Sequence, residues 1–282
     1  MGLYIWMSDL SVGRVLFSKY TPPAGIALLL WDHCLTFDEE VITIWASFKR
    51  PILPKVIYVM NRYFTEAVLL YTAYVFTELR RLADNKSCVT VFWLIPMSTT
   101  FLAGILQFLI MLRAYRLWDH KKTIRRVLLV VFVACMTGSL VLCVRMVLTL
   151  LEIVELPSPR VGICSVPEVP KTTPFLMGIP LLFNIFVISV SFYNALEEPR
   201  RHESEVFASL RRDGAKIYFI VSLLWVLLLI TSIFAEMLVY FPILILSWSV
   251  AVNLTSRMHL RIESLRLSNN AHPTMMYATP EY

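Results

Sequence analysis

The chain has 282 residues, of which 57% are apolar and 16% are charged, and its formal net charge is +6. A soluble domain carries about 25% charged residues because its surface faces water, so this chain has too few charges to cover a globule of its size. Its basic residues lie in short segments between long apolar runs, as they do in membrane proteins. The composition therefore excludes a soluble domain and favours the lipid bilayer, not nucleic acid, as the partner of the positive charge.

Long apolar windows predict an all-α membrane protein, a seven-transmembrane helix bundle, because about 20 such residues cross a hydrocarbon core of ~30 Å. The run from Ile217 to Ser256 carries only one charge, Glu236. As a single helix it would overshoot the bilayer about twofold, so we divide it at a turn between Glu236 and Pro242. Within residues 22–256, the predicted spans cover residues 22–45, 55–77, 88–112, 127–151, 174–196, 217–235 and 238–256.

Three segments flank these spans. Residues 1–21 are expected to form a short outer segment without the basic stretch and cleavage site of a signal peptide. Beyond the last span, Met258, Ile262 and Leu265 share one helical face, which predicts an amphipathic interfacial helix over residues 257–267. The polar tail, residues 268–282, is predicted to be disordered.

The distribution of basic residues sets the expected orientation. With the N-terminus outside, 17 basic residues lie on the inner side and seven on the outer side. This bias favours an outer N-terminus and a cytoplasmic C-terminus. Two inner loops are densely basic, and they either dock a cytosolic effector or anionic lipid or only set the topology. Their basic residues are Arg113, Arg116, Lys121, Lys122, Arg125, Arg126, Arg211 and Arg212.

Several motifs resemble a known family. The stretch LLLWDHCLTFDEEVITIW is followed by LPKVIYVMNRY, and further along come MLRAYRLW, LRRDGAKIYF and SRMHLRIESL. Together, over about residues 24–265, they resemble the basidiomycete-type fungal seven-helix membrane proteins that carry the domain of unknown function 6533. The resemblance implies a seven-helix topology and a fungal source, and it implies no chemistry because the family has no established activity.

No motif predicts catalysis, a metal or a cofactor. The five histidines form no HExxH or similar metal set, and the chain has no GxSxG, P-loop or GxGxxG. A retinal protein needs a lysine in the last span, and residues 217–256 contain none. We therefore expect a protein that is not an enzyme.

Seven spans with an outer N-terminus favour a receptor-like protein with an unknown ligand, in the plasma membrane or an endomembrane. The likeness to rhodopsin-like receptors is architectural only, because no acid precedes Arg113 and the last span has no NPxxY. One alternative is a structural or lipid-organising bundle. A small-solute transporter is another, although the chain shows no internal repeat of broken helices.

Cys88 and Cys164 are the two cysteines on the predicted outer side, and we predict a disulfide between them. It would close a loop of about 75 residues and stabilise the protein by roughly 4 kcal/mol in an oxidising exterior. The alternative is two free thiols, which a membrane-impermeant maleimide would label without reductant. The other cysteines lie in apolar spans and are expected to be inert: Cys34, Cys135 and Cys143.

Asn85 begins a glycosylation sequon, Asn85-Lys86-Ser87, on the predicted outer side. It lies against the membrane edge, where enzyme access is poor. We therefore expect the sequon to be unused, whereas a glycan found there would establish the orientation.

Ionisable residues interrupt the first two spans. Asp32 lies ten residues after Pro22, and Arg62 lies seven residues after Lys55. These positions place the two groups at depths that differ by roughly 5 Å in a ~30 Å core. An unpaired charge there costs about 2.5–3.5 kcal/mol, so we predict an Asp32–Arg62 ion pair.

Glu66 lies one turn beyond Arg62 on the same face and is expected to compete for the arginine. His33 is expected to face elsewhere, as a hydrogen-bonded packing residue. Two roles stay open for this intramembrane cluster. The favoured role is to set helix register, and the other is that of a polar ligand floor or a proton-sensitive switch.

Overall fold

The computed structural model describes residues 2–46, 52–78, 85–117, 122–153, 169–197 and 205–271, and this part of the chain is all-helical. It forms seven α-helices, with a π-helical turn at the end of the first. Their bounds are α1 (Gly2–Glu40), the π turn η1 (Val41–Trp45), α2 (Ile52–Glu78), α3 (Asn85–Leu117), α4 (Lys122–Ile153), α5 (Thr173–Glu197), α6 (Glu205–Phe234) and α7 (Met237–Ala271).

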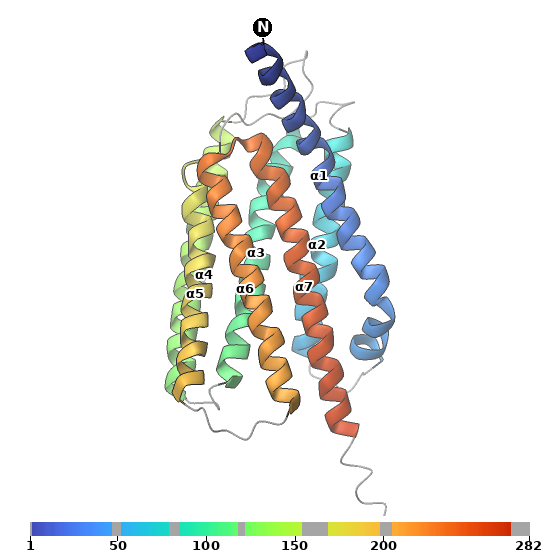
Figure 1. Cartoon of the computed structure of the whole chain (residues 1–282), viewed down its shortest axis with the longest axis vertical. Coiled ribbons are helices and arrows are strands. Elements are labelled where there is room, and N and C mark those ends of the chain that lie inside the picture. The colour runs from blue at the N-terminus through green and yellow to red at the C-terminus, as the bar shows by residue number, and fades with distance from the viewer. Residues whose placement is uncertain are drawn as a thin grey trace, which may run out of the picture.

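The helices run alternately up and down in one elongated bundle (Figure 1). Sequence neighbours pack against each other, and α1 closes the bundle by packing along α7, its most extensive contact. The start of α1 and the end of α7 lie at opposite ends of the molecule (Figure 1). At the first of these ends, Arg14 of α1 lies 2.8 Å from Glu236 in the α6–α7 link. The sequence placed both residues on the outer side.

Among the described residues, five helices are long and apolar enough to cross a bilayer, which makes the chain a multi-pass membrane protein. Their candidate spans are Trp93–Leu112, Lys122–Glu152, Thr173–Tyr193, Lys216–Phe234 and Met237–Ser264. The first two helices are as long as the others, but charged residues interrupt their apolar runs. The count of seven spans and the orientation therefore stay predictions.

The apolar run from Ile217 to Ser256 is divided, as expected. Helix α6 ends at Phe234 and α7 begins at Met237, at the start of the interval in which the turn was predicted. The carbonyl of Glu236 accepts the amides of Val239 and Tyr240 at 2.9 and 3.0 Å. The turn is therefore tight, and the two helices run antiparallel.

The interfacial helix predicted over residues 257–267 is wrong in its position. These residues continue α7 without a break, and Met258, Leu260 and Glu263 are buried. Leu260 packs with Ile44 of the π turn and Tyr58 of α2. These partners hold the end of α7 against the bundle, and heptad-like periodicity alone could not reveal them.

The flanking segments also differ from expectation. Helix α1 begins at Gly2 and passes through Pro22 and Pro23, so residues 2–21 extend the first helix. At the other end α7 reaches Ala271, inside the segment predicted as a tail, and residues 272–282 lie outside the described part.

The predicted disulfide falls outside the described side chains. Cys88 lies in α3, but its side chain is not described, and neither is residue Cys164. The pairing therefore stays a prediction, as does the use of the sequon at Asn85, the first residue of α3. The three intraspan cysteines are free thiols: Cys34, Cys135 and Cys143.

Candidate functional site

Two polar features lie inside the bundle, and the first joins α1, α2 and α7. On α1, the residues Asp32, Thr36 and Glu40 recur at intervals of four and are all buried. Residues four apart share one face of a helix. We call the group of ionisable and phenolic residues that meet there the polar cluster, which consists of Asp32, His33, Glu40, Tyr58, Arg62, Tyr63, Glu66 and Arg257.

Asp32 pairs with two arginines. Its Oδ2 lies 3.2 Å from Nη2 of Arg62, whose side chain is 0% exposed. The structure thus brings together the two residues whose depths predicted a pair. Its other oxygen, Oδ1, lies 2.6 Å from Nε of Arg257 on α7. That third helix makes Asp32 a junction and not one half of a simple pair.

Glu66 contacts the histidine more closely than the arginine. Its Oε1 lies 2.7 Å from Nδ1 of His33 and 3.8 Å from Nε of Arg62. The expected competition for Arg62 therefore favours Asp32. His33 is hydrogen-bonded, as expected, but it belongs to the same cluster because its Nε2 also lies 3.4 Å from Oε2 of Glu40.

Glu40 is fully buried and accepts three hydrogen bonds. The Tyr58 hydroxyl donates to its Oε2 at 2.8 Å, and Nε1 of Trp45 donates to its Oε1 at 2.8 Å. The Tyr63 hydroxyl donates to Oε1 as well. The π turn shapes this arrangement, because it follows Glu40 directly and carries Trp45.

Sequence reasoning missed four members of the cluster: Glu40, Tyr58, Tyr63 and Arg257. A signal existed on the first two helices, because the spacing of four that links Asp32 to Glu40 also links Tyr58, Arg62 and Glu66. Nothing local marks Arg257, which lies one residue after the last predicted span.

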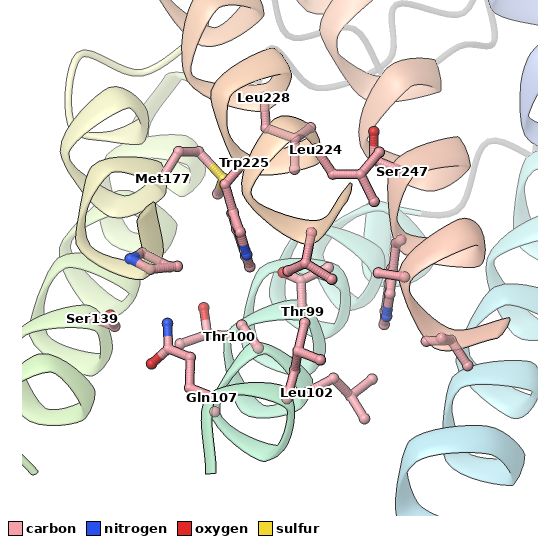
Figure 2. Close-up of a pocket in the computed structure, with 18 of the residues that line it drawn as sticks. Thr99, Thr100, Leu102, Gln107, Ser139, Met177, Leu224, Trp225, Leu228 and Ser247 are labelled. Atoms are coloured by element: carbon pink, nitrogen blue, oxygen red, sulfur yellow. The ribbon is translucent and has the colours of Figure 1, made fainter. Parts of the chain in front are cut away.

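The second feature is a cavity of about 70 Å³ in the middle of the bundle. All helices except α1 contribute to its wall, and Figure 2 shows Thr100 and Gln107 of α3 reaching into it from one side and Trp225 of α6 from the other. The described residues that line it include no charged side chain. Its polar side chains are amides, hydroxyls and indoles: Asn61, Thr99, Thr100, Gln107, Ser139, Ser247, Thr255, Trp225 and Trp248.

Two buried polar atoms of this wall have no hydrogen-bond partner among the described residues. They are Oε1 of Gln107, whose residue is 1% exposed, and Nε1 of Trp248, whose residue is 8% exposed. Buried polar groups are nearly always paired. One acceptor and one donor are therefore available to a molecule in the cavity.

The cavity and the polar cluster touch through neighbouring residues. Asn61 lines the cavity and precedes Arg62, while Thr255 lines it two residues before Arg257. Between them, Nδ2 of Asn61 donates to the Ser256 hydroxyl at 3.2 Å. A shift of α7 relative to α2 at the cavity would therefore change the cluster as well.

The basic inner loops are described only in part. Lys122, Arg125 and Arg126 are exposed at the start of α4, at the end of the bundle where α7 ends (Figure 1). The side chains of Arg113, Arg116, Arg211 and Arg212 are not described, nor is Lys121. Within the described residues, no three His, Cys, Asp or Glu side chains are grouped for a metal ion.

One segment of the chain is similar to a known protein family. No curated protein matches the chain. Residues 20–65 match the model of a family of unknown function (DUF6533). This segment holds six of the eight cluster residues and stops one residue before Glu66. Over residues 20–65 the match agrees with the resemblance drawn from the motifs, and this segment is similar to the DUF6533 family in the helices that build most of the polar cluster.

Proposed function

We propose that the protein is a receptor-like, non-catalytic membrane protein that binds a small neutral ligand in the central cavity. The observation that carries the proposal is the pair of unpartnered polar atoms in its wall, Oε1 of Gln107 and Nε1 of Trp248. A ligand would accept one hydrogen bond and donate another, and it would relieve two buried polar groups whose desolvation is otherwise uncompensated.

The size and lining of the cavity define the ligand class. An apolar cavity of about 150 Å³ holds benzene, and this one has about 70 Å³. The ligand therefore has only a few non-hydrogen atoms. An ion is disfavoured because the described lining contains no opposite charge to pair with it. Small alcohols and primary amides meet these conditions.

The contact between Asn61 and Ser256 would connect ligand binding in the cavity to a change in the polar cluster. A ligand that draws α7 towards α3 would move Ser256 relative to Asn61 and alter the ion pairs of Arg62 and Arg257 with Asp32. Arg257 lies directly after the last predicted span, on the side that is predicted to face the cytoplasm. This arrangement supports a receptor-like role over that of a purely structural or lipid-organising bundle.

The test measures thermal unfolding of the purified protein in lipid nanodiscs with a series of small alcohols and primary amides. A ligand that binds the native state raises Tm, and the rise grows with the logarithm of the ligand concentration above Kd. We expect one group of compounds to raise Tm in the wild type and to lose this effect in Gln107→Leu, which removes the acceptor.

The matched control is Asn184→Leu, because Asn184 is an equally buried amide that does not line the cavity. This variant should keep the ligand-dependent rise in Tm. If none of the small alcohols and primary amides raised the Tm of the wild type, the proposal would be contradicted. A binding compound that also crosses proteoliposome membranes would favour the transporter, whereas compound-dependent recruitment of a cytosolic protein would support the receptor.

A further inference from the structure

Arg145 on α4 differs from Arg62, the other arginine that lies within a predicted span. Arg62 is fully buried and ion-paired, whereas Arg145 is exposed on the surface of the bundle. Its neighbours on this surface, Val141 and Leu148, are 57% and 52% exposed. Ionisable residues within membrane spans almost always face the bundle interior and pair there. The outward position of Arg145 therefore needs a separate explanation.

Arg145 and Glu152 form no side-chain ion pair or hydrogen bond with the described residues. Only the backbone carbonyl of Arg145 accepts a hydrogen bond, from Oγ1 of Thr149 at 3.0 Å. Glu152 is also exposed, and it lies seven residues further along α4, which is almost two full turns. The two side chains therefore share one face of α4, which carries a cation and an anion that no described residue neutralises.

The position of Arg145 along α4 matches a membrane boundary. Residues 127–144 contain no charged side chain and follow Arg126 directly. At 1.5 Å per residue this stretch measures about 27 Å, close to the ~30 Å of a hydrocarbon core. Arg145 therefore lies at the edge of the core, and its flexible stem lets the guanidinium reach the headgroup layer. Glu152 lies about 10 Å further along the helix axis, among the headgroups.

The rule that places basic residues on the cytoplasmic side does not account for Arg145. Helix α4 ends at the end of the bundle where α1 begins (Figure 1), which is the end predicted to lie outside. A cation at this boundary opposes the general bias of basic residues. The layer that its guanidinium reaches holds the phosphates of the lipids, and arginine binds phosphate through paired, charge-assisted hydrogen bonds.

We propose that Arg145 and Glu152 form a binding site for the headgroup of a zwitterionic phospholipid in the leaflet at this end of the bundle. In such a headgroup the phosphate lies next to the acyl chains, and the ammonium group lies farther from the core. Arg145 at the edge of the core binds the phosphate, Glu152 binds the ammonium group, and an acyl chain packs along Val141. Both charged side chains are flexible and can turn towards each other around one headgroup.

The order of the two charges selects the class of lipid. An anionic phospholipid offers Arg145 the same phosphate but gives Glu152 no cation, so a zwitterionic headgroup satisfies both residues and an anionic one satisfies only the first. Neither residue lines the central cavity. The lipid site is therefore independent of the ligand proposed for that cavity.

The test measures lipid binding to the full chain in a non-ionic detergent by native mass spectrometry. Phosphatidylethanolamine is the zwitterionic probe, and phosphatidylglycerol is the anionic probe. We expect the wild type to bind phosphatidylethanolamine more tightly. Arg145→Leu should weaken the binding of both lipids about tenfold, because it removes hydrogen bonds between charged groups. Glu152→Gln should abolish the preference between the two lipids. The matched control is Lys171→Gln, which changes another exposed cation near the start of α5 and should bind both lipids as the wild type does.

Three results would overturn the proposal. In the first, Arg145→Leu binds both lipids as tightly as the wild type does. In the second, the wild type binds phosphatidylglycerol at least as tightly as phosphatidylethanolamine, which would remove Glu152 from the site. The third comes from thermal unfolding in detergent without lipid. A lower Tm of Arg145→Leu there would mean that a carboxylate of the chain neutralises Arg145, whereas an unchanged or higher Tm supports a lipid partner.

Discussion

Helix α4 has the highest mean hydropathy of the five spans, yet only 17% of its span is buried, whereas 44% of the less hydropathic span of α7 is buried. The buried face of α7 is rich in polar residues, among them Ser247, Ser249 and Asn253. In a soluble protein the more apolar helix would be the more buried one. In lipid an apolar side chain gains little by leaving the bilayer for the protein, so packing, small residues and polar contacts select the interior.

The same contrast separates two regions of the bundle. Between α3, α4, α5 and α6 lies an apolar core cluster that includes Phe183 and Val187. Where α1, α2 and α7 meet, the interior is a network of ion pairs and hydrogen bonds. Stability should therefore depend on the ion pairs where α1, α2 and α7 meet, and on close side-chain packing between α3, α4, α5 and α6.

The largest effect is expected for Arg62→Met in the polar cluster. The side chain of Arg62 is fully buried, and its loss leaves Asp32 and Glu66 without a shared cation. Breaking a buried ion pair costs about 3–5 kcal/mol, which unfolding in a denaturing detergent would measure. The matched control, Arg125→Met on the exposed start of α4, should change the stability by less than about 0.5 kcal/mol.

A charge swap gives a sharper result at the same place. Asp32→Arg and Arg62→Asp should each reduce folding and surface delivery, but the double swap should recover only part of the loss. The reason is Arg257, which lies 2.6 Å from Asp32 and would then face a second arginine. Full recovery by the double swap would contradict the role of Asp32 as a junction of three helices.

Phe183→Ala tests the apolar region. Phe183 is 1% exposed, and its ring lies edge-to-face with that of Phe132 at 5.9 Å. Truncating a buried phenylalanine costs about 3–5 kcal/mol, and the same unfolding assay applies. Phe192 lies on the same helix but is 65% exposed, so Phe192→Ala should have almost no effect. Equal losses in the two variants would show that the outer face of α5 is not lipid-facing.

A lysine on the outer face of α4 tests the lipid-facing surface directly. Val141 is exposed near the middle of that span, and Val141→Lys should cost about 2.5–3.5 kcal/mol of insertion free energy. Glycosylation-tagged insertion assays measure this cost, with Val141→Leu as the control. If Val141→Lys did not change the insertion free energy, this face of α4 would contact water or protein and not lipid.

A smaller effect is expected at Gly25, where α1 and α7 are in close contact. A Cβ at Gly25 would lie 3.2 Å from Oγ of Ser249 and 3.4 Å from Cα of Leu246, whereas a Cβ at Gly178 would meet nothing within 4 Å. Gly25→Leu should therefore destabilise the protein by about 1–3 kcal/mol through overpacking. Gly178→Leu on α5 should be close to neutral in the same measurement.

The smallest effect belongs to the exposed ion pair between Arg14 and Glu236. Both side chains are partly open to solvent, and such pairs contribute about 0–1 kcal/mol. Arg14→Ala should lower Tm only slightly, and added salt should reduce the difference further. A loss as large as that of Arg62→Met would show that the link between α6 and α7 is as important to the fold as the cluster.

Local sequence properties determined the fold class, the division at Glu236 and the resemblance to the family. Helix length, apolar runs and motif order can be read from the sequence without knowing which helices are in contact. The depth of a residue in the bilayer also follows from its sequence position, because each helical residue adds 1.5 Å along the helix axis. That is why Asp32 and Arg62 could be matched before their contact was known.

Tertiary structure decided the remaining features, because they depend on how each helix is rotated and on which helices are adjacent. Arg257 reaches Asp32 only because α7 packs along α1. His33 and Glu40 join the same cluster only because the face of α1 that carries them turns towards α2. The unpartnered atoms of Gln107 and Trp248 share one cavity wall only when α3 and α7 are in place. Rotating an apolar helix about its axis barely changes its free energy in lipid. The rotation of each helix is therefore determined by side-chain packing between helices and not by hydropathy.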